Sequence, residues 1–72
     1  MPKSPDPKKI LERIIESHLD MIAYYRSTGM AANHFSIQIE ALQLGKYIAQ
    51  YSDHAPNADV LYYAGRLTDV LK

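Results

Sequence analysis

The sequence has no cysteine and no tryptophan, and its 8 Lys and Arg balance its 8 Asp and Glu. Without cysteine the chain has no disulfide, thiolate zinc site, iron–sulfur cluster or cysteine nucleophile. A formal net charge of zero argues against a protein built mainly to hold polyanions, because counterion release needs clustered basic side chains. No apolar run approaches the roughly 18 residues that span a bilayer, and no signal-peptide pattern opens the chain. We therefore expect a cytoplasmic protein that makes no membrane contact.

Strand-forming residues and helix breakers are also scarce. The chain has only two Val and two Thr, but eight Ala, seven Leu and seven Ile. This composition favours helix over sheet. The length of 72 residues and the hydrophobic share of 47% predict one all-α domain at 7–72, after an extended tail at 1–6. A domain this short buries about 60–65% of its unfolded surface. Self-association or docking on a partner is therefore expected to support it.

The first helix is predicted from about Pro7 to Thr28, with Asp6 as N-cap and Gly29 as a left-handed cap. Its carboxylates Glu12, Glu16 and Asp20, spaced by four, are expected on the side that faces water. The apolar residues follow steps of three and four and form the predicted buried stripe: Ile10, Leu11, Ile14, Ile15, Leu19, Met21, Ile22 and Tyr25.

The second helix is predicted from about Ala31 to Ser52 and carries apolar residues on two sides. One seam consists of Ile37, Ala41, Leu44, Ile48 and Tyr51, and a second seam beside it of Phe35, Ile39 and Leu42. So little polar surface is typical of a helix sandwiched between others. The sequence leaves the first residue of this helix open: either Met30 is already helical, or Asn33 is the N-cap. Gly45 lies in mid-helix, where a glycine costs about 1 kcal/mol relative to Ala, so it is expected to permit close packing against another backbone.

The third helix is predicted from about Ala58 to Leu71, with Asn57 as its cap after Pro56. Its buried stripe consists of Val60, Tyr63, Ala64, Leu67, Val70 and Leu71. Three helices with short links predict an up-down-up bundle, in which two long helices form an antiparallel hairpin beside a shorter third helix. In one arrangement the first and third helices cover the middle one. In the other arrangement, which we favour, the two long helices have about 22 residues each and the third helix has about 14. The long helices then extend beyond the third helix by about 12 Å. This overhang leaves apolar surface for a homodimer.

Few residues carry a catalytic or metal-binding pattern. Arg13 and His18 have the Arg-x4-His spacing that resembles the motif of HEPN ribonucleases, which implies a histidine base beside a phosphate-binding arginine. Five positions on a helix place the two residues on different sides of it. His18, His34 and His54 belong to different elements, so no metal site or cofactor is predicted. Ser52, Asp53 and His54 are consecutive, which suits a turn and not a catalytic relay.

Two further stretches resemble known families. Residues 60–67, Val-Leu-Tyr-Tyr-Ala-Gly-Arg-Leu, resemble the first helix of a tetratricopeptide repeat, which implies peptide binding in a helical groove. Residues 10–51 resemble the small helical-hairpin phosphatases that act on response regulators. The signature of those phosphatases, Ser-Gln-Glu-Leu-Asp, is absent, and Ile-Glu-Ala-Leu-Gln stands near its place at 39–43. The chain is assigned to neither family.

The six tyrosines are the unusual feature of the composition. Tyr24, Tyr47 and Tyr62 fall on the polar sides of their helices, where tyrosine suits a protein interface. They are the candidate protein-binding residues; alternatively, they form the rim of a small core. Replacing Tyr47 by Ala is expected to weaken partner binding and leave the thermal stability nearly unchanged.

The sequence predicts a small non-enzymatic helical protein-interaction module, a regulator, adaptor or inhibitor that is homodimeric and also binds an unidentified protein. No catalytic, metal-binding or cofactor-binding residue is predicted. The first alternative is a small DNA-binding transcriptional regulator. The second alternative is a helical-hairpin phosphatase or nuclease that uses Glu40 or His18.

Overall fold

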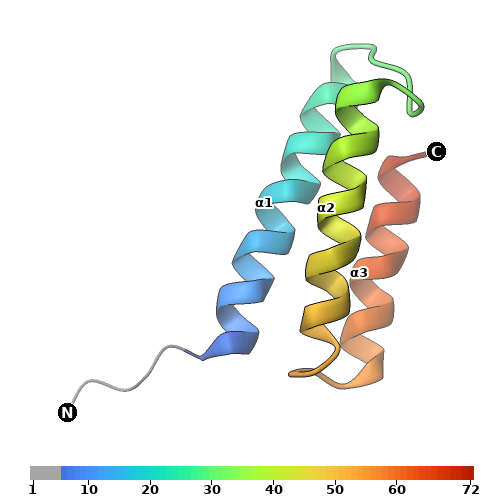
Figure 1. Cartoon of the computed structure of the whole chain (residues 1–72). Helices are drawn as coiled ribbons and strands as arrows, with labels where there is room; N and C mark the ends of the chain where they lie inside the picture. The colour runs from blue at the N-terminus through green and yellow to red at the C-terminus, as the bar shows by residue number, and fades with distance from the viewer. Residues whose placement is uncertain (1–5) are drawn as a thin grey trace.

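The computed structural model describes residues 6–72, which form three helices: α1 at Pro7–Ser27, α2 at Phe35–Tyr51 and α3 at Asn57–Val70 (Figure 1). No strand occurs within these residues. α1 and α2 form an antiparallel hairpin, α3 returns beside both, and every pair of helices is in contact. The predicted all-α three-helix bundle is confirmed. Of the predicted tail at 1–6, residues 1–5 lie outside the described part, and Asp6 is extended.

Both ends of α1 follow the predicted capping chemistry. The Asp6 carboxylate accepts a hydrogen bond of 3.0 Å from the Lys8 backbone N–H, and Pro7 takes the first helical position, where no N–H is needed. The helix ends at Ser27, and Gly29 has a φ of 91°, a left-handed conformation that suits a residue without Cβ.

The predicted starts of α2 and α3 are wrong by one to four residues. α2 begins at Phe35 because the His34 ring, and not Asn33, caps it: His34 Nδ1 accepts from the Ser36 backbone N–H over 3.1 Å. α3 begins at Asn57 itself, with Pro56 in the cap position and no side-chain cap. Consequently α2 has 17 residues against 14 in α3, a difference of about 4–5 Å at 1.5 Å per residue. The long overhang predicted for α2 is therefore wrong.

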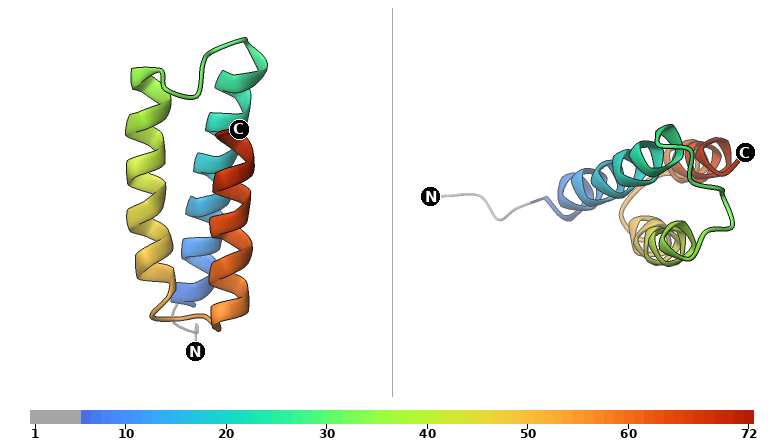
Figure 2. Two further views of the ribbon diagram at one scale, coloured as in Figure 1. Left: turned by 90° about the vertical axis from the view of Figure 1, so that its right-hand side faces the viewer. Right: turned by 90° about the horizontal axis from the view of Figure 1, so that it is seen from above.

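The hydrophobic core lies on the line where the three helices meet (Figure 2). The predicted stripe of α1 is correct for its centre, but Ile10 and Met21 are exposed because they lie at its margin. The core residues are Leu11, Ile15, Leu19 and Ile22 of α1, Ile37, Leu44, Ile48 and Tyr51 of α2, and Tyr63 of α3. Other predicted residues of α3, including Val60, Leu67 and Val70, pack half-buried around them. Within residues 6–72, no helix combines the length and apolar character needed to cross a bilayer.

Candidate functional site

An uncovered apolar stripe runs along the outside of α2. It continues the predicted second seam, Phe35, Ile39 and Leu42, through Lys46 and Ala49, in steps of four, three, four and three. We call these five residues the outer seam. Phe35 is 74% exposed, Leu42 69% and Ile39 39%. Large apolar side chains in one line and in contact with water are typical of an interaction surface.

The outer seam is uncovered because α1 and α3 lie on the same side of α2. Both pack on the parallel seam Ile37, Ala41, Leu44, Ile48 and Tyr51, four of whose residues are buried. Viewed from above, the three helices form a triangle, and the outer side of α2 faces away from the other two (Figure 2). Of the two arrangements predicted, the one in which the first and third helices cover both apolar sides of the middle helix is therefore wrong, because the second seam stays exposed.

Gly45 shows the same lack of cover. A Cβ built on Gly45 meets no atom within 4 Å, so no backbone among residues 6–72 packs closely against it. The predicted close packing at this glycine is absent from the bundle.

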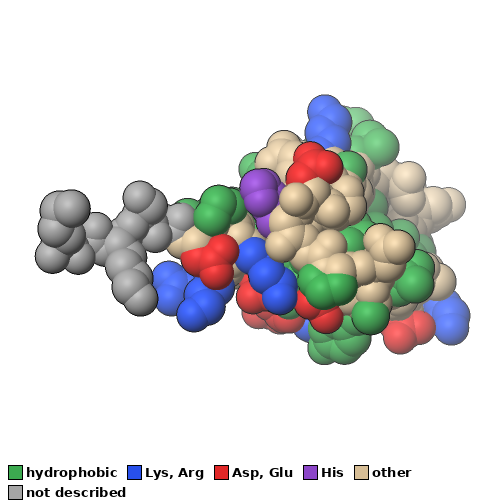
Figure 3. All heavy atoms as spheres, turned by 90° about the horizontal axis from the view of Figure 1, so that it is seen from below, with side chains coloured by type: hydrophobic (Ala, Val, Ile, Leu, Met, Phe, Trp, Pro, Cys, Tyr) green, Lys and Arg blue, Asp and Glu red, His purple; other side chains and the backbone are tan. Residues whose placement is uncertain are grey.

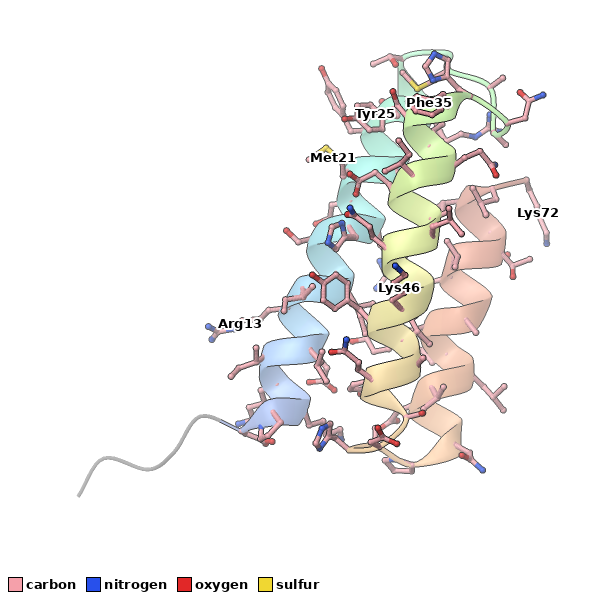
Figure 4. The ribbon with its side chains drawn as sticks, viewed as in Figure 1. Arg13, Met21, Tyr25, Phe35, Lys46 and Lys72 are labelled. Atoms are coloured by element: carbon pink, nitrogen blue, oxygen red, sulfur yellow. The ribbon has the colours of Figure 1, made fainter. Side chains whose placement is uncertain are left out.

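At one end of the hairpin α1 also carries apolar side chains near the surface, of which Met21 is 44% exposed and Tyr25 is half-buried against the core. Met21 and Tyr25 lie at the same end of the bundle as Phe35, near the loop that joins α1 to α2 (Figure 4). Charge is sparse along α2, whose two charged residues are Glu40 and Lys46. Glu40 is half-buried against α1, so Lys46 alone adds charge to the outer side.

The three candidate tyrosines lie on three different helices and do not form one patch. Tyr24 is 64% exposed at the end of α1, and Tyr62 is 59% exposed near the start of α3. The Arg66 guanidinium lies 5.7 Å from the centre of the Tyr62 ring, within cation–π range. Tyr47 is half-buried and packs against the core. Tyr24 and Tyr62 are therefore largely exposed to water, although the Tyr62 ring also contacts Arg66 and Tyr63, whereas the Tyr47 ring is packed within the bundle.

His18, Glu40 and Tyr47 form a polar cluster across the α1–α2 contact. His18 Nδ1 lies 2.7 Å from Glu40 Oε2, and the His18 ring stacks on Tyr47 with centroids 5.3 Å apart. An ionised carboxylate only accepts hydrogen bonds, so His18 donates. Arg13 points away from the bundle (Figure 4) and has no part in this pair, although it borders the same cleft as His18 and Tyr47. The cluster links the two helices of the hairpin.

Two carboxylates of α1 that were expected to face water instead face the other helices. The Tyr51 hydroxyl donates to Glu12 Oε2 over 2.6 Å, and Arg66 of α3 donates to Glu16. Burial, with the hydrogen bond to Glu12, raises the pKa of Tyr51 well above its ordinary value. Burial and the nearby carboxylates likewise raise the pKa of Tyr63. Their hydroxyls stay protonated and available as donors at neutral pH.

Charges of both signs are mixed over the described surface. Lys8 lies 3.2 Å from Asp59, and Lys72 lies 3.3 Å from Asp69. Seen from below, Lys and Arg side chains lie next to Asp and Glu (Figure 3). No group of three or more His, Asp or Glu side chains among residues 6–72 is arranged to hold a metal ion. Comparison with protein-family models, curated proteins and solved structures finds no match to this chain.

Proposed function

We propose that this chain is a small, non-enzymatic helical protein-interaction module that acts as a homodimer and regulates or adapts a second, unidentified protein. The observation that carries the proposal is the outer seam, in which the side chains of Phe35, Ile39 and Leu42 lie in one line and are exposed to water. Burying exposed apolar area on a partner is favourable by about 25 cal/mol per Å². A module of this size has few other means of raising its stability.

The two kinds of exposed apolar residue serve two contacts in this proposal. The aliphatic and aromatic side chains of the outer seam pair the copies. Tyr24 on α1 and Tyr62 on α3 stay exposed for contact with the second protein, since tyrosine contributes a large contact area and a hydroxyl at small entropic cost. Regulation then consists of docking, in which the dimer presents each tyrosine twice.

A pair of matched substitutions tests the proposal. Leu42 of the outer seam and Leu61 of α3 are both 69% exposed, so Leu42→Asp and Leu61→Asp change the same side chain at the same exposure. We expect Leu42→Asp to weaken self-association on the order of 30-fold or more, as for loss of an interface hot spot. Leu61→Asp is expected to leave it unchanged. Sedimentation equilibrium measures both, and circular dichroism checks that each variant is folded.

Equal effects of the two substitutions would show that the outer seam is not the interface. Wild-type protein that stays monomeric over the concentration series would overturn the homodimer.

A further inference from the structure

The spacing along the outer seam is that of one strand of a coiled coil. Steps of four and three residues repeat over the whole length of α2, so Phe35, Ile39, Leu42, Lys46 and Ala49 occupy alternating seam positions of a heptad. Such a seam on a straight helix is matched by a second helix with the same repeat. The seam on the buried side of α2 has the same spacing and is filled by α1 and α3.

From this repeat we infer that the occupant of the outer seam is α2 of a second copy, running antiparallel, with Phe35 facing the partner's Lys46. This inference rests on the homodimer proposed above, which pairs through the outer seam, and adds the direction and register of the pair. A twofold axis places the same patch on both copies, so each contact occurs twice. Ile39 then faces the partner's Leu42, and Leu42 the partner's Ile39, which puts the aliphatic side chains at the centre.

Lys46 decides the direction. In a parallel, in-register pair the two Lys46 ammonium groups would face each other within an apolar contact, and like charges placed opposite one another repel. In the antiparallel pair each Lys46 lies across the partner's Phe35, about 16 Å along the axis from the partner's Lys46 at 1.5 Å per residue. The aliphatic part of lysine covers the ring, and the ammonium group reaches water or the ring face.

The exposed state of these residues fits this arrangement. Phe35 lies at one end of α2 and Lys46 lies toward the other end (Figure 4), and both side chains are exposed. Glu40, the other charged residue of α2, is turned toward His18 and does not enter the contact. No charged side chain of α2 other than Lys46 therefore has to be accommodated at the interface.

Thiol crosslinking tests direction and register together, because the wild-type chain has no cysteine. Phe35→Cys and Lys46→Cys replace exposed side chains, so both variants are expected to fold. Each is treated with a short bismaleimide alone and as a refolded equimolar mixture. The inference predicts a crosslinked dimer in the mixture at least 10-fold more abundant than in either variant alone.

Each other outcome overturns the inference in a recognisable way. Efficient crosslinking of each variant alone would mean a parallel pair. A dimeric mass without crosslinks in the mixture would mean that the copies pair in another register or through another face. The homodimer itself would then stand, and the Leu42→Asp test would show whether the outer seam still forms its interface. A monomeric wild-type protein would overturn both proposals.

A second measurement does not depend on thiols. Lys46→Glu is mixed with wild type, and native mass spectrometry gives the ratio of mixed to like dimers. In the antiparallel pair position 46 faces position 35, so we expect mixing close to the statistical ratio. A parallel pair would favour the mixed dimer, in which Lys46 faces the glutamate, and a strong excess of it would overturn the inference.

Discussion

The buried hydroxyl of Tyr51, at the end of α2, donates a hydrogen bond of 2.6 Å to the Glu12 carboxylate near the start of α1. The Tyr51 ring is at the same time packed edge-on against Tyr63 of α3, with centroids 5.4 Å apart. One side chain therefore connects all three helices at this end of the bundle. The bond is charge-assisted, which makes it stronger than a bond between neutral groups.

Removing this hydroxyl is expected to destabilise the bundle. Tyr51→Phe keeps the ring and loses the donor, so the free energy of unfolding should fall by about 1–2 kcal/mol, as for hydrogen bonds to charged groups. Urea unfolding followed by circular dichroism measures the change. Tyr24→Phe, on an exposed ring, is the matched control and should change stability by less than about 0.5 kcal/mol. Equal effects of the two substitutions would argue against the role given to the Tyr51–Glu12 bond.

The raised pKa values of Tyr51 and Tyr63 predict loss of stability in alkaline solution. Both pKa values are higher in the folded state than in the unfolded chain, where tyrosine titrates near 10. Their contribution to stability is complete below a pH of about 10, and is lost as the pH rises from there toward the folded-state values. Urea unfolding from about pH 9 to 11 should show this fall, and a smaller fall in Tyr51→Phe. A flat profile in the wild type would contradict the burial of the two hydroxyls.

The stack of Tyr47 on His18 alters what is expected of the candidate tyrosines. Tyr47→Ala removes a half-buried ring from the core margin and should lower the free energy of unfolding by about 1–2 kcal/mol, since aromatic pairs add to the burial energy. Tyr62→Ala, on a more exposed ring, should cost less than about 1 kcal/mol. Thermal unfolding of the two variants compares them. If Tyr47→Ala lowers the free energy of unfolding by less than Tyr62→Ala does, the Tyr47 ring is exposed and not packed against the core.

The two glycines at positions 29 and 45 should respond oppositely to alanine. Gly45→Ala places a methyl group in open space within α2 and should raise the free energy of unfolding of the monomer by about 0.5–1 kcal/mol. Gly29→Ala should lower it, because φ is 91° there and an L-residue is strained in that conformation. Measurements below the dissociation constant of the dimer isolate the effect on the monomer. A loss of stability in Gly45→Ala under those conditions would mean that the chain itself packs against position 45.

Periodicity and capping residues predicted most of the fold. The four-residue and three-residue steps in α1, and the cap formed by Asp6 and Pro7, sufficed for the position of that helix. The start of α2 was not predictable in this way because the ring of His34, and not the better-known cap residue Asn33, accepts the Ser36 N–H. Such a choice depends on the loop geometry, which the local sequence does not specify.

The candidate site was only partly predictable for a related reason. The sequence shows that α2 has two apolar seams, but both have the same heptad spacing, and nothing in the pattern states which of them α1 and α3 cover. The side chains of Glu12 and Glu16 were expected in water because they are charged. Their partners Tyr51 and Arg66 are 39 and 50 residues away in the chain, so the pairings follow from the tertiary packing alone.

The proposed homodimer is held together by the outer seam of α2. The most direct test is the absolute mass of the wild-type protein, measured by light scattering after size exclusion over a concentration series. A homodimer should give twice the chain mass of 8.2 kDa at high concentration, falling toward 8.2 kDa on dilution. A mass of 8.2 kDa at every concentration would contradict it.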